Sequence, residues 1–193
     1  MKKRVGVLAL QGDFEAHGRA LERAGAEPVY VRSAGELEGL HGMVLPGGES
    51  TTMLKLLRAQ GLFEELKAFA QSRPVFGTCA GVILMANDVV HPSQESLGLL
   101  DLSVERNAYG RQIDSTIARL APSEEFESRT FPGQLEAVFI RAPIIRRAGE
   151  KSTVLAEFRD EPVLVEQGRH LVATFHPELT ADSRVHQLFL QKL

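Results

Sequence analysis

In the first half of the chain, short apolar runs alternate with segments whose apolar residues recur at helical spacing. The runs at 4–10, 28–31, 43–45 and 74–76 are typical of buried parallel strands. Helical spacing follows at 14–24, at 53–66, where Ser50 or Thr51 is a suitable N-cap, and in the apolar segment 82–86. Strands that alternate with helices in this way predict a parallel sheet with right-handed crossovers.

The second half contains more strand signals than helix signals. Strands are expected at 102–106, 115–120, 138–140, 154–158, 163–165 and 171–175, and the close succession of the last three favours antiparallel pairing. Residues 121–133 are rich in polar residues, proline and glycine, and predict a loop. The chain ends in a helix at 185–193. Together the two halves predict one α/β domain over residues 1–193, with a mixed, mainly parallel central sheet flanked by helices.

Composition excludes several classes of function. The 193 residues are 44% hydrophobic and 24% charged, and the net charge of -3 argues against a mainly electrostatic nucleic-acid binder. No apolar run approaches the ~18–20 residues that a membrane-spanning helix needs. The basic N-terminus, Met1 to Arg4, is not followed by a signal-peptide core or a cleavage site. These features predict a cytoplasmic protein.

The single cysteine, Cys79, lies between a predicted strand and a predicted helix. A lone cysteine forms no internal disulfide and no cysteine-rich zinc site. The segment 77–81, Gly-Thr-Cys-Ala-Gly, has the G-x-nucleophile-x-G pattern of a nucleophile elbow, in which glycines leave room for a sharp turn. The start of the following helix favours the thiolate, and the N–H of Ala80 is suited to stabilise an oxyanion. The competing interpretation is a passive thiol in a glycine-rich turn.

One of the six histidines is placed to serve that thiol as an acid and base. His176 follows the predicted strand 171–175, whose carboxyl end should share the sheet edge with Cys79. Pro177 keeps His176 out of the helical region, so Glu178 can reach back and fix the imidazole as the third member of a triad does. The others lie in predicted helices, loops or strand starts: His17, His41, His91, His170 and His186.

A second glycine-rich turn, at 45–50, also joins a strand to a helix. Its paired glycines let backbone N–H groups approach a ligand closely. A phosphate loop is disfavoured because the Walker lysine is missing and Glu49 would repel phosphate. An oxyanion hole built from the N–H groups of Gly48 and Ala80 fits the thiol chemistry better. Arg106 and Arg141 follow strands and are candidates to bind a substrate carboxylate.

The sequence resembles the triad class I glutamine amidotransferases and, among them, the family of glutaminase subunits of pyridoxal 5′-phosphate synthase. The resemblance covers essentially the whole chain. Gly-x-Cys-x-Gly and His-Pro-Glu mark the superfamily, and three further motifs indicate the vitamin B6 family. The segments that carry the resemblance are 6–12, 45–53, 76–81, 104–112, 139–143 and 175–180. It implies a flavodoxin-like three-layer fold.

The resemblance also implies the chemistry. Cys79 attacks the side-chain amide of L-glutamine, His176 protonates the departing ammonia, and water then hydrolyses the glutamyl thioester with Glu178 orienting His176. The residues implied to line the glutamine site are Gly47, Gly48, Glu49, Arg106, Ile140 and Arg141. Ammonia passes to a separate synthase subunit, which combines it with a pentose phosphate and a triose phosphate. The chain itself is implied to need no cofactor and no metal.

The partner is expected to switch the enzyme on. Gln11 leaves the first strand at the sheet edge that should carry Cys79, and a peptide flip at Gly47 or Gly48 would move an oxyanion donor. The resemblance adds that Gln11 lies near the contact with the synthase, so Gln11 is the candidate gating residue.

Two alternatives remain open. Another glutaminase subunit, serving histidine or aminobenzoate synthesis, would share the triad but differ at 106–112 and 139–143. A non-catalytic binding module with a redox-sensing thiol is the other. The intact His-Pro-Glu argues against such a sensor, because a sensor needs no general base.

Overall fold

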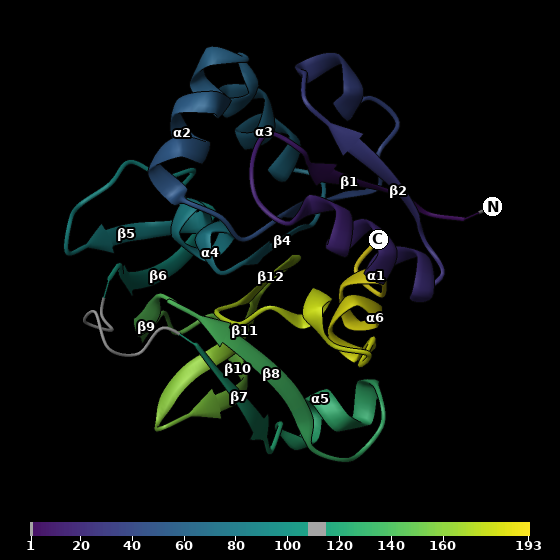
Figure 1. The fold of residues 1–193 in the computed structure, drawn as a ribbon, viewed down its shortest axis with the longest axis vertical. Helices are drawn as coiled ribbons and strands as arrows, with labels where there is room; N and C mark the ends of the chain where they lie inside the picture. The colour runs from purple at the N-terminus through teal and green to yellow at the C-terminus, as the bar shows by residue number, and fades with distance from the viewer. Residues whose placement is uncertain (1, 108–114) are drawn as a thin grey trace.

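The computed structural model describes residues 2–107 and 115–193 and contains a seven-stranded central sheet (Figure 1). The strand order is β10-β11-β12-β4-β3-β1-β2. All neighbours are parallel except at β11, which is antiparallel to both β10 and β12. The mixed, mainly parallel sheet predicted from sequence is therefore confirmed. The strands are β1 (Arg4–Leu8), β2 (Glu27–Val31), β3 (Gly42–Leu45), β4 (Val75–Thr78), β10 (Ser152–Phe158), β11 (Glu161–Gln167) and β12 (His170–Ala173).

Helices cover both faces of this sheet, which gives the three layers (Figure 1). The cores on the two faces are separate. Met43 and Leu45 of β3 pack into one core with α2, α3 and α4, whereas Val44 between them packs into the other with α1, α5 and α6. Alternate strand residues point to opposite faces, so a strand buried on both sides is apolar throughout. The helices are α1 (Phe14–Arg23), α2 (Ser50–Ala59), α3 (Leu62–Ala70), α4 (Ala80–Met85), α5 (Glu124–Arg129) and α6 (Arg184–Leu190).

Two smaller sheets extend the outer layers. One has the order β5-β6-β9 and the other pairs β7 with β8. Their strands are β5 (Ala86–Val90), β6 (Leu100–Glu105), β7 (Ser115–Leu120), β8 (Leu135–Ile140) and β9 (Ile144–Ala148), and two 3-10 turns, η1 (Ala34–Leu37) and η2 (Pro177–Leu179), complete the described elements. The sequence pattern predicted β6, β7 and β8 but missed β5 and β9.

The expected loop at 121–133 is wrong in one respect, because α5 forms inside it. Ser123 is its N-cap, and the Ser123 hydroxyl accepts a hydrogen bond from the Phe126 N–H at 3.3 Å. Phe126, the apolar residue of this helix, has a fully buried side chain. A helix with a single buried apolar residue has too little periodicity to be recognised.

The expected helix after Ser50 is also corrected. It consists of two helices, α2 and α3, which separate at Gly61 with a φ of 65°. The N-cap of α2 is Glu49 rather than Ser50 or Thr51, and the Glu49 carboxylate accepts hydrogen bonds from the N–H groups of Thr51 and Thr52. The capping residue is therefore one of the residues expected to face substrate.

Four central strands end at the same edge of the sheet. The register pairs Leu45 of β3 with Gly77 of β4 and Ala173 of β12 with Thr78 of β4, so the segments that leave β3, β4 and β12 emerge side by side. β1 is parallel to β3 and ends at this edge too. Open α/β sheets place their ligands at the carboxyl ends of parallel strands, so this edge is where a site is expected.

Candidate active site

Cys79 occupies a strained turn between β4 and α4. Its φ of 48° and ψ of -107° are unusual for a residue with a side chain, and its N–H donates to the Ala173 carbonyl at 2.9 Å. A Cβ at Gly77 would lie 2.6 Å from Met85 Sδ, and a Cβ at Gly81 would collide with the Leu45 carbonyl. The two glycines thus permit the close packing of the elbow, as the sequence pattern predicted. Such strain is characteristic of nucleophile turns.

His176 and Glu178 are brought together by the turn η2. His176 Nδ1 lies 2.7 Å from Glu178 Oε1, and both side chains are buried. The His176 N–H donates to the Val138 carbonyl at 2.8 Å, which fixes the start of the turn. The carboxylate is therefore directed at Nδ1 of the His176 ring.

Gly47 lies against both Cys79 and the His176 ring. A Cβ there would lie 3.3 Å from the Cβ of Cys79 and would overlap the His176 ring at Cε1. The nucleophile and the base therefore approach each other across a position that only glycine fills without displacing one of them.

The charges of the three groups are coupled. Burial by itself would lower the pKa of His176, but the Cys79 and Glu178 side chains outweigh it and raise the pKa to about 10. Burial would raise the pKa of Glu178, whereas His17 and His176 hold it below its usual range. At neutral pH the pair is therefore an imidazolium and a carboxylate, and the imidazolium has a proton to give to a leaving group.

A cleft of about 400 Å³ opens over the thiol. It is lined by every residue that the sequence assigned to the nucleophile, base, substrate and oxyanion roles, except Glu178, which lies behind His176. The assigned residues on its wall are Gln11, Gly47, Gly48, Glu49, Cys79, Ala80, Arg106, Ile140, Arg141 and His176. The Ile140 carbonyl is 3.8 Å from Cys79 Sγ, so β8 closes the cleft beside the nucleophile.

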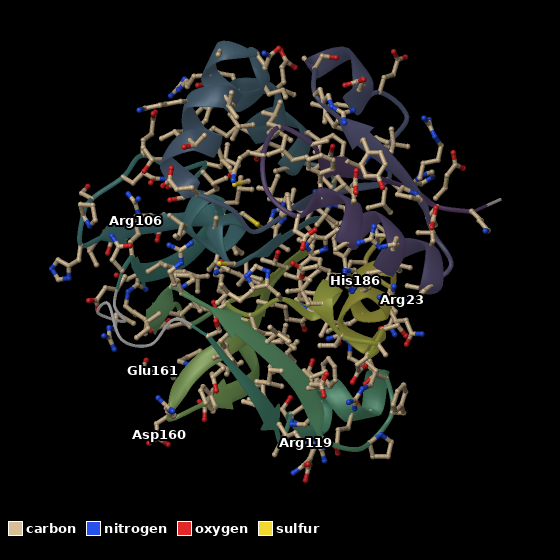
Figure 2. The ribbon with its side chains drawn as sticks, viewed as in Figure 1. Arg23, Arg106, Arg119, Asp160, Glu161 and His186 are labelled. Carbon is tan, nitrogen blue, oxygen red and sulfur yellow. The ribbon has the colours of Figure 1, made fainter. Side chains whose placement is uncertain are left out.

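Glu49 and Arg106 form one wall of this cleft. Hydrogen bonds from Thr51 and Thr52 overcome partial desolvation and lower the pKa of Glu49 to about 2. Arg106 Nη2 donates to Thr51 Oγ1 at 2.9 Å and lies 3.8 Å from Glu49 Oε1. Figure 2 labels Arg106 on the side of the molecule that carries β5 and β6. Arg106 and Glu49 therefore already face each other on this wall in the absence of a ligand.

Gln11 connects the end of β1 to the glycine turn. Its Oε1 accepts a hydrogen bond from the Glu49 N–H at 2.9 Å, and a Cβ at Gly48 would collide with the Gln11 amide. Gly12, with a φ of 94°, packs directly on the Gly47 carbonyl. The Gln11 side chain is therefore in contact with the glycine turn at both Gly48 and Glu49.

The remaining histidines have other surroundings. His41 accepts a hydrogen bond from the backbone N–H of Arg4, and His170 accepts one from the backbone N–H of Val75. The His91 side chain is exposed. His17 and His186, which the sequence placed only in helices, lie fully buried behind Glu178. Sequence reasoning missed this pair.

Two kinds of feature are not found among the described residues. Across 2–107 and 115–193, no group of His, Cys, Asp or Glu has the arrangement of a metal site. In the same residues no helix is long and apolar enough to cross a membrane. The part of the 104–112 motif from residue 108 onward lies outside the described residues.

A strained thiol, an imidazolium and a buried carboxylate at the carboxyl edge of a parallel sheet form the arrangement that is typical of cysteine-dependent acyl transfer. The comparisons with known proteins agree with this class. The SNO glutamine amidotransferase family matches residues 7–193. The chain therefore belongs to the SNO glutamine amidotransferase family.

Individual relatives are similar along their full length. The chain is 65% identical to a pyridoxal 5′-phosphate synthase subunit PdxT of Solibacter usitatus (strain Ellin6076), covering 99% of this chain and 100% of that protein. It is 53% identical to the protein of the same name in Koribacter versatilis (strain Ellin345), covering 97% and 94%. A crystal structure of a glutamine amidotransferase superposes with a TM-score of 0.88 at 49% identity, covering 97% of each chain.

Proposed function

We propose that the chain, as one glutamine amidotransferase domain over residues 1–193, hydrolyses L-glutamine to L-glutamate and ammonia through Cys79, His176 and Glu178. The observation that supports this assignment is the convergence of the three side chains beneath one cleft. His176 Nδ1 is 2.7 Å from the Glu178 carboxylate, and Gly47 lies against both the His176 ring and Cys79. Family membership supplies the substrate class.

The chemistry follows from the charges of the site. The Cys79 thiolate, paired with the His176 imidazolium, attacks the side-chain carbonyl carbon of glutamine, and the C–N bond breaks as the imidazolium protonates the nitrogen, which leaves as ammonia. The neutral imidazole then takes a proton from water, which attacks the thioester and releases glutamate. Glu178 stays ionised throughout, orients His176 through Nδ1 and stabilises its positive charge.

Backbone donors and charged side chains complete the proposed site. The N–H groups of Gly48 and Ala80 would hold the developing oxyanion, a role in which loss of one donor typically lowers kcat by about 10²–10³-fold. Glu49 and Arg106 form the preformed wall, and Ile140 borders the thiol. Arg141 makes no ion pair with a described residue, so its guanidinium is available for the α-carboxylate of glutamine.

The destination of the ammonia is a separate proposal. Relatives that cover almost the whole chain are named as subunits of pyridoxal 5′-phosphate synthase. We infer that this chain delivers ammonia to the synthase subunit for vitamin B6 synthesis in the cytoplasm, with no cofactor or metal of its own. Gln11 is proposed to gate the reaction, because its carboxamide holds Glu49 and contacts Gly48 beside the oxyanion position.

The test is ammonia release from glutamine by the chain mixed with its synthase subunit. Cys79→Ala should abolish release, and Cys79→Ser should nearly do so, because a hydroxyl ionises far less readily than a thiol. Binding to the synthase should persist in both variants. Hydrolysis by Cys79→Ala well above background would overturn the triad assignment. Release by the wild type that supports no pyridoxal 5′-phosphate formation would overturn the assigned destination alone.

A further inference from the structure

Two buried histidines lie behind Glu178, on the side away from the cleft. His17 comes from α1 and His186 from α6, and neither is exposed to solvent. His17 Nδ1 is 3.1 Å from His186 Nε2, while His17 Nε2 is 2.9 Å from Thr78 Oγ1 and 3.3 Å from Glu178 Oε2. Figure 2 shows His186 on the side of the sheet that α1 and α6 cover. Neither histidine lines the cleft, so neither touches substrate.

Both rings are neutral at physiological pH. Burial lowers the pKa of His17, with Glu178 opposing the shift, and burial lowers the pKa of His186 to about 3. A neutral imidazole has one N–H donor and one acceptor nitrogen. The hydrogen bond between the two rings therefore runs in one of two directions, and that direction decides which atom of His17 faces the catalytic carboxylate.

The surroundings of His186 Nδ1 decide in which direction the hydrogen bond between the two rings runs. Among the described residues, His186 Nδ1 has no hydrogen-bond partner. A buried N–H without a partner is rarer than a buried acceptor without one, so the proton of His186 belongs on Nε2, which donates to His17 Nδ1. The proton of His17 is then on Nε2 and points between Thr78 Oγ1 and Glu178 Oε2. The opposite direction would leave a buried N–H unpaired and set a lone pair against the carboxylate.

We propose that His17 is a positioning residue of the glutaminase, whose Nε2–H faces Glu178 Oε2 and keeps Oε1 directed at His176. This inference rests on the proposed function and extends it to a side chain outside the cleft. Glu178 Oε2 makes no hydrogen bond with any described residue, and His17 Nε2, whose N–H also faces Thr78 Oγ1 at 2.9 Å, lies 3.3 Å from it as a polar group that partly offsets its burial.

The electrostatic surroundings define the expected pH effect. Glu178 is faced by His176 in its own turn and by His17 from α1; Asp13 and His176 also act on His17, and Arg23 acts on His186. Removing the His17 N–H takes a donor away from the charged form of Glu178. The Glu178 carboxylate then becomes protonated at a higher pH. The acidic limb of the pH–rate profile therefore shifts to higher pH as well.

The experiment uses the chain in complex with its synthase and compares His17→Phe with His17→Gln and Phe76→Leu. The phenyl ring keeps the aromatic volume without the donor, and glutamine restores an N–H. Phe76→Leu perturbs the ring that packs edge-on against both histidines while leaving their N–H groups in place. His17→Phe should lower kcat on the order of tenfold, as loss of an outer-shell partner does elsewhere, with KM for glutamine within twofold. His17→Gln should recover part of kcat, and Phe76→Leu should leave kcat and the pH profile unchanged.

A second arm separates positioning from general destabilisation. In a Glu178→Gln background, His17→Phe should cause no further loss, because the group that it positions is gone. An equal loss in both backgrounds, a change confined to KM, or an unmoved acidic limb would overturn the proposal. Should His17→Phe fail to fold, His186→Phe carries the same pH comparison with the same displaced limb expected, and His17→Gln, which keeps an N–H, should show a smaller displacement.

The rate at which iodoacetamide alkylates Cys79, followed against pH without glutamine, keeps this result distinct from the proposed function. A wild-type complex that releases no ammonia would refute the glutaminase assignment. The alkylation profile would still show whether His17→Phe displaces the acidic limb, and an undisplaced limb would refute the role of His17.

Discussion

Gly47→Ala is the substitution whose effect the structure specifies most directly. The glycine has no positive φ, so alanine fits its backbone conformation. The new methyl group, however, would overlap His176 Cε1, because the two carbon atoms would lie closer than 3.0 Å, a separation that Cβ atoms in real structures essentially never show. It would also lie 3.3 Å from the Cβ of Cys79. The ring of His176 has to move away from the thiol to accommodate it.

The size of the effect follows from that displacement. A ring shift on the order of 1 Å relieves the overlap, and misplacing a catalytic group by that distance lowers the rate by about 10²-fold. We therefore expect kcat for ammonia release to fall about a hundredfold in the presence of saturating synthase. The matched control is Gly35→Ala, since a Cβ at Gly35 has no neighbour within 4 Å and should leave kcat unchanged.

Circular dichroism and thermal unfolding of both variants establish that each is folded. A Gly47→Ala enzyme with wild-type kcat would refute the inference that His176 and Cys79 face each other across this glycine. An equal loss of kcat in Gly35→Ala would show that the assay reports general perturbation.

Three further predictions concern the triad and its gating. Glu178→Gln should lower kcat less than His176→Asn does, because Glu178 only orients and stabilises the imidazole; a silent Glu178→Gln, measured by ammonia release, would contradict this. Because the pKa of His176 is raised from 6.5 to about 10, its protonation stabilises the fold fully below pH 6.5, and this contribution is lost as the pH rises through about 10. Urea unfolding over that window should show a steeper fall in unfolding free energy for the wild type than for His176→Asn, and parallel curves would refute the shift. The free chain should release ammonia at least tenfold more slowly than the complex, and Gln11→Ala should reduce this stimulation more than it reduces synthase binding; equal turnover with and without saturating synthase would exclude gating.

The site at this sheet edge could be predicted from sequence because its proposed nucleophile and base each follow a strand. Cys79 and His176 stand directly after apolar runs, and parallel strands end at a common edge, so spacing along the chain translates into proximity in space. Glu178 is only two residues from His176, which makes their contact a local matter. The elbow glycines were likewise interpretable from sequence, because their role is steric and confined to one turn.

The buried pair behind Glu178 could not be predicted in the same way. His17 lies three residues after Phe14 and four before Leu21, so its position on the apolar face of α1 was visible in the sequence. Its partner His186 is 169 residues away, and no periodicity connects the two. The Glu49 cap was missed for a different reason: serine and threonine are the usual N-caps, and the local pattern offered both directly after it.

The position of β12 between β4 and β11 has a consequence for how the protein acquires its activity during synthesis. Cys79 leaves the ribosome long before His176, and the two meet only when the last strand inserts between two strands that precede it in the chain. Such long-range pairing is a slow part of folding. A nascent or truncated chain therefore contains Cys79 without His176 beside it. We expect hydrolysis of glutamine to begin only when β12 has taken its place between β11 and β4.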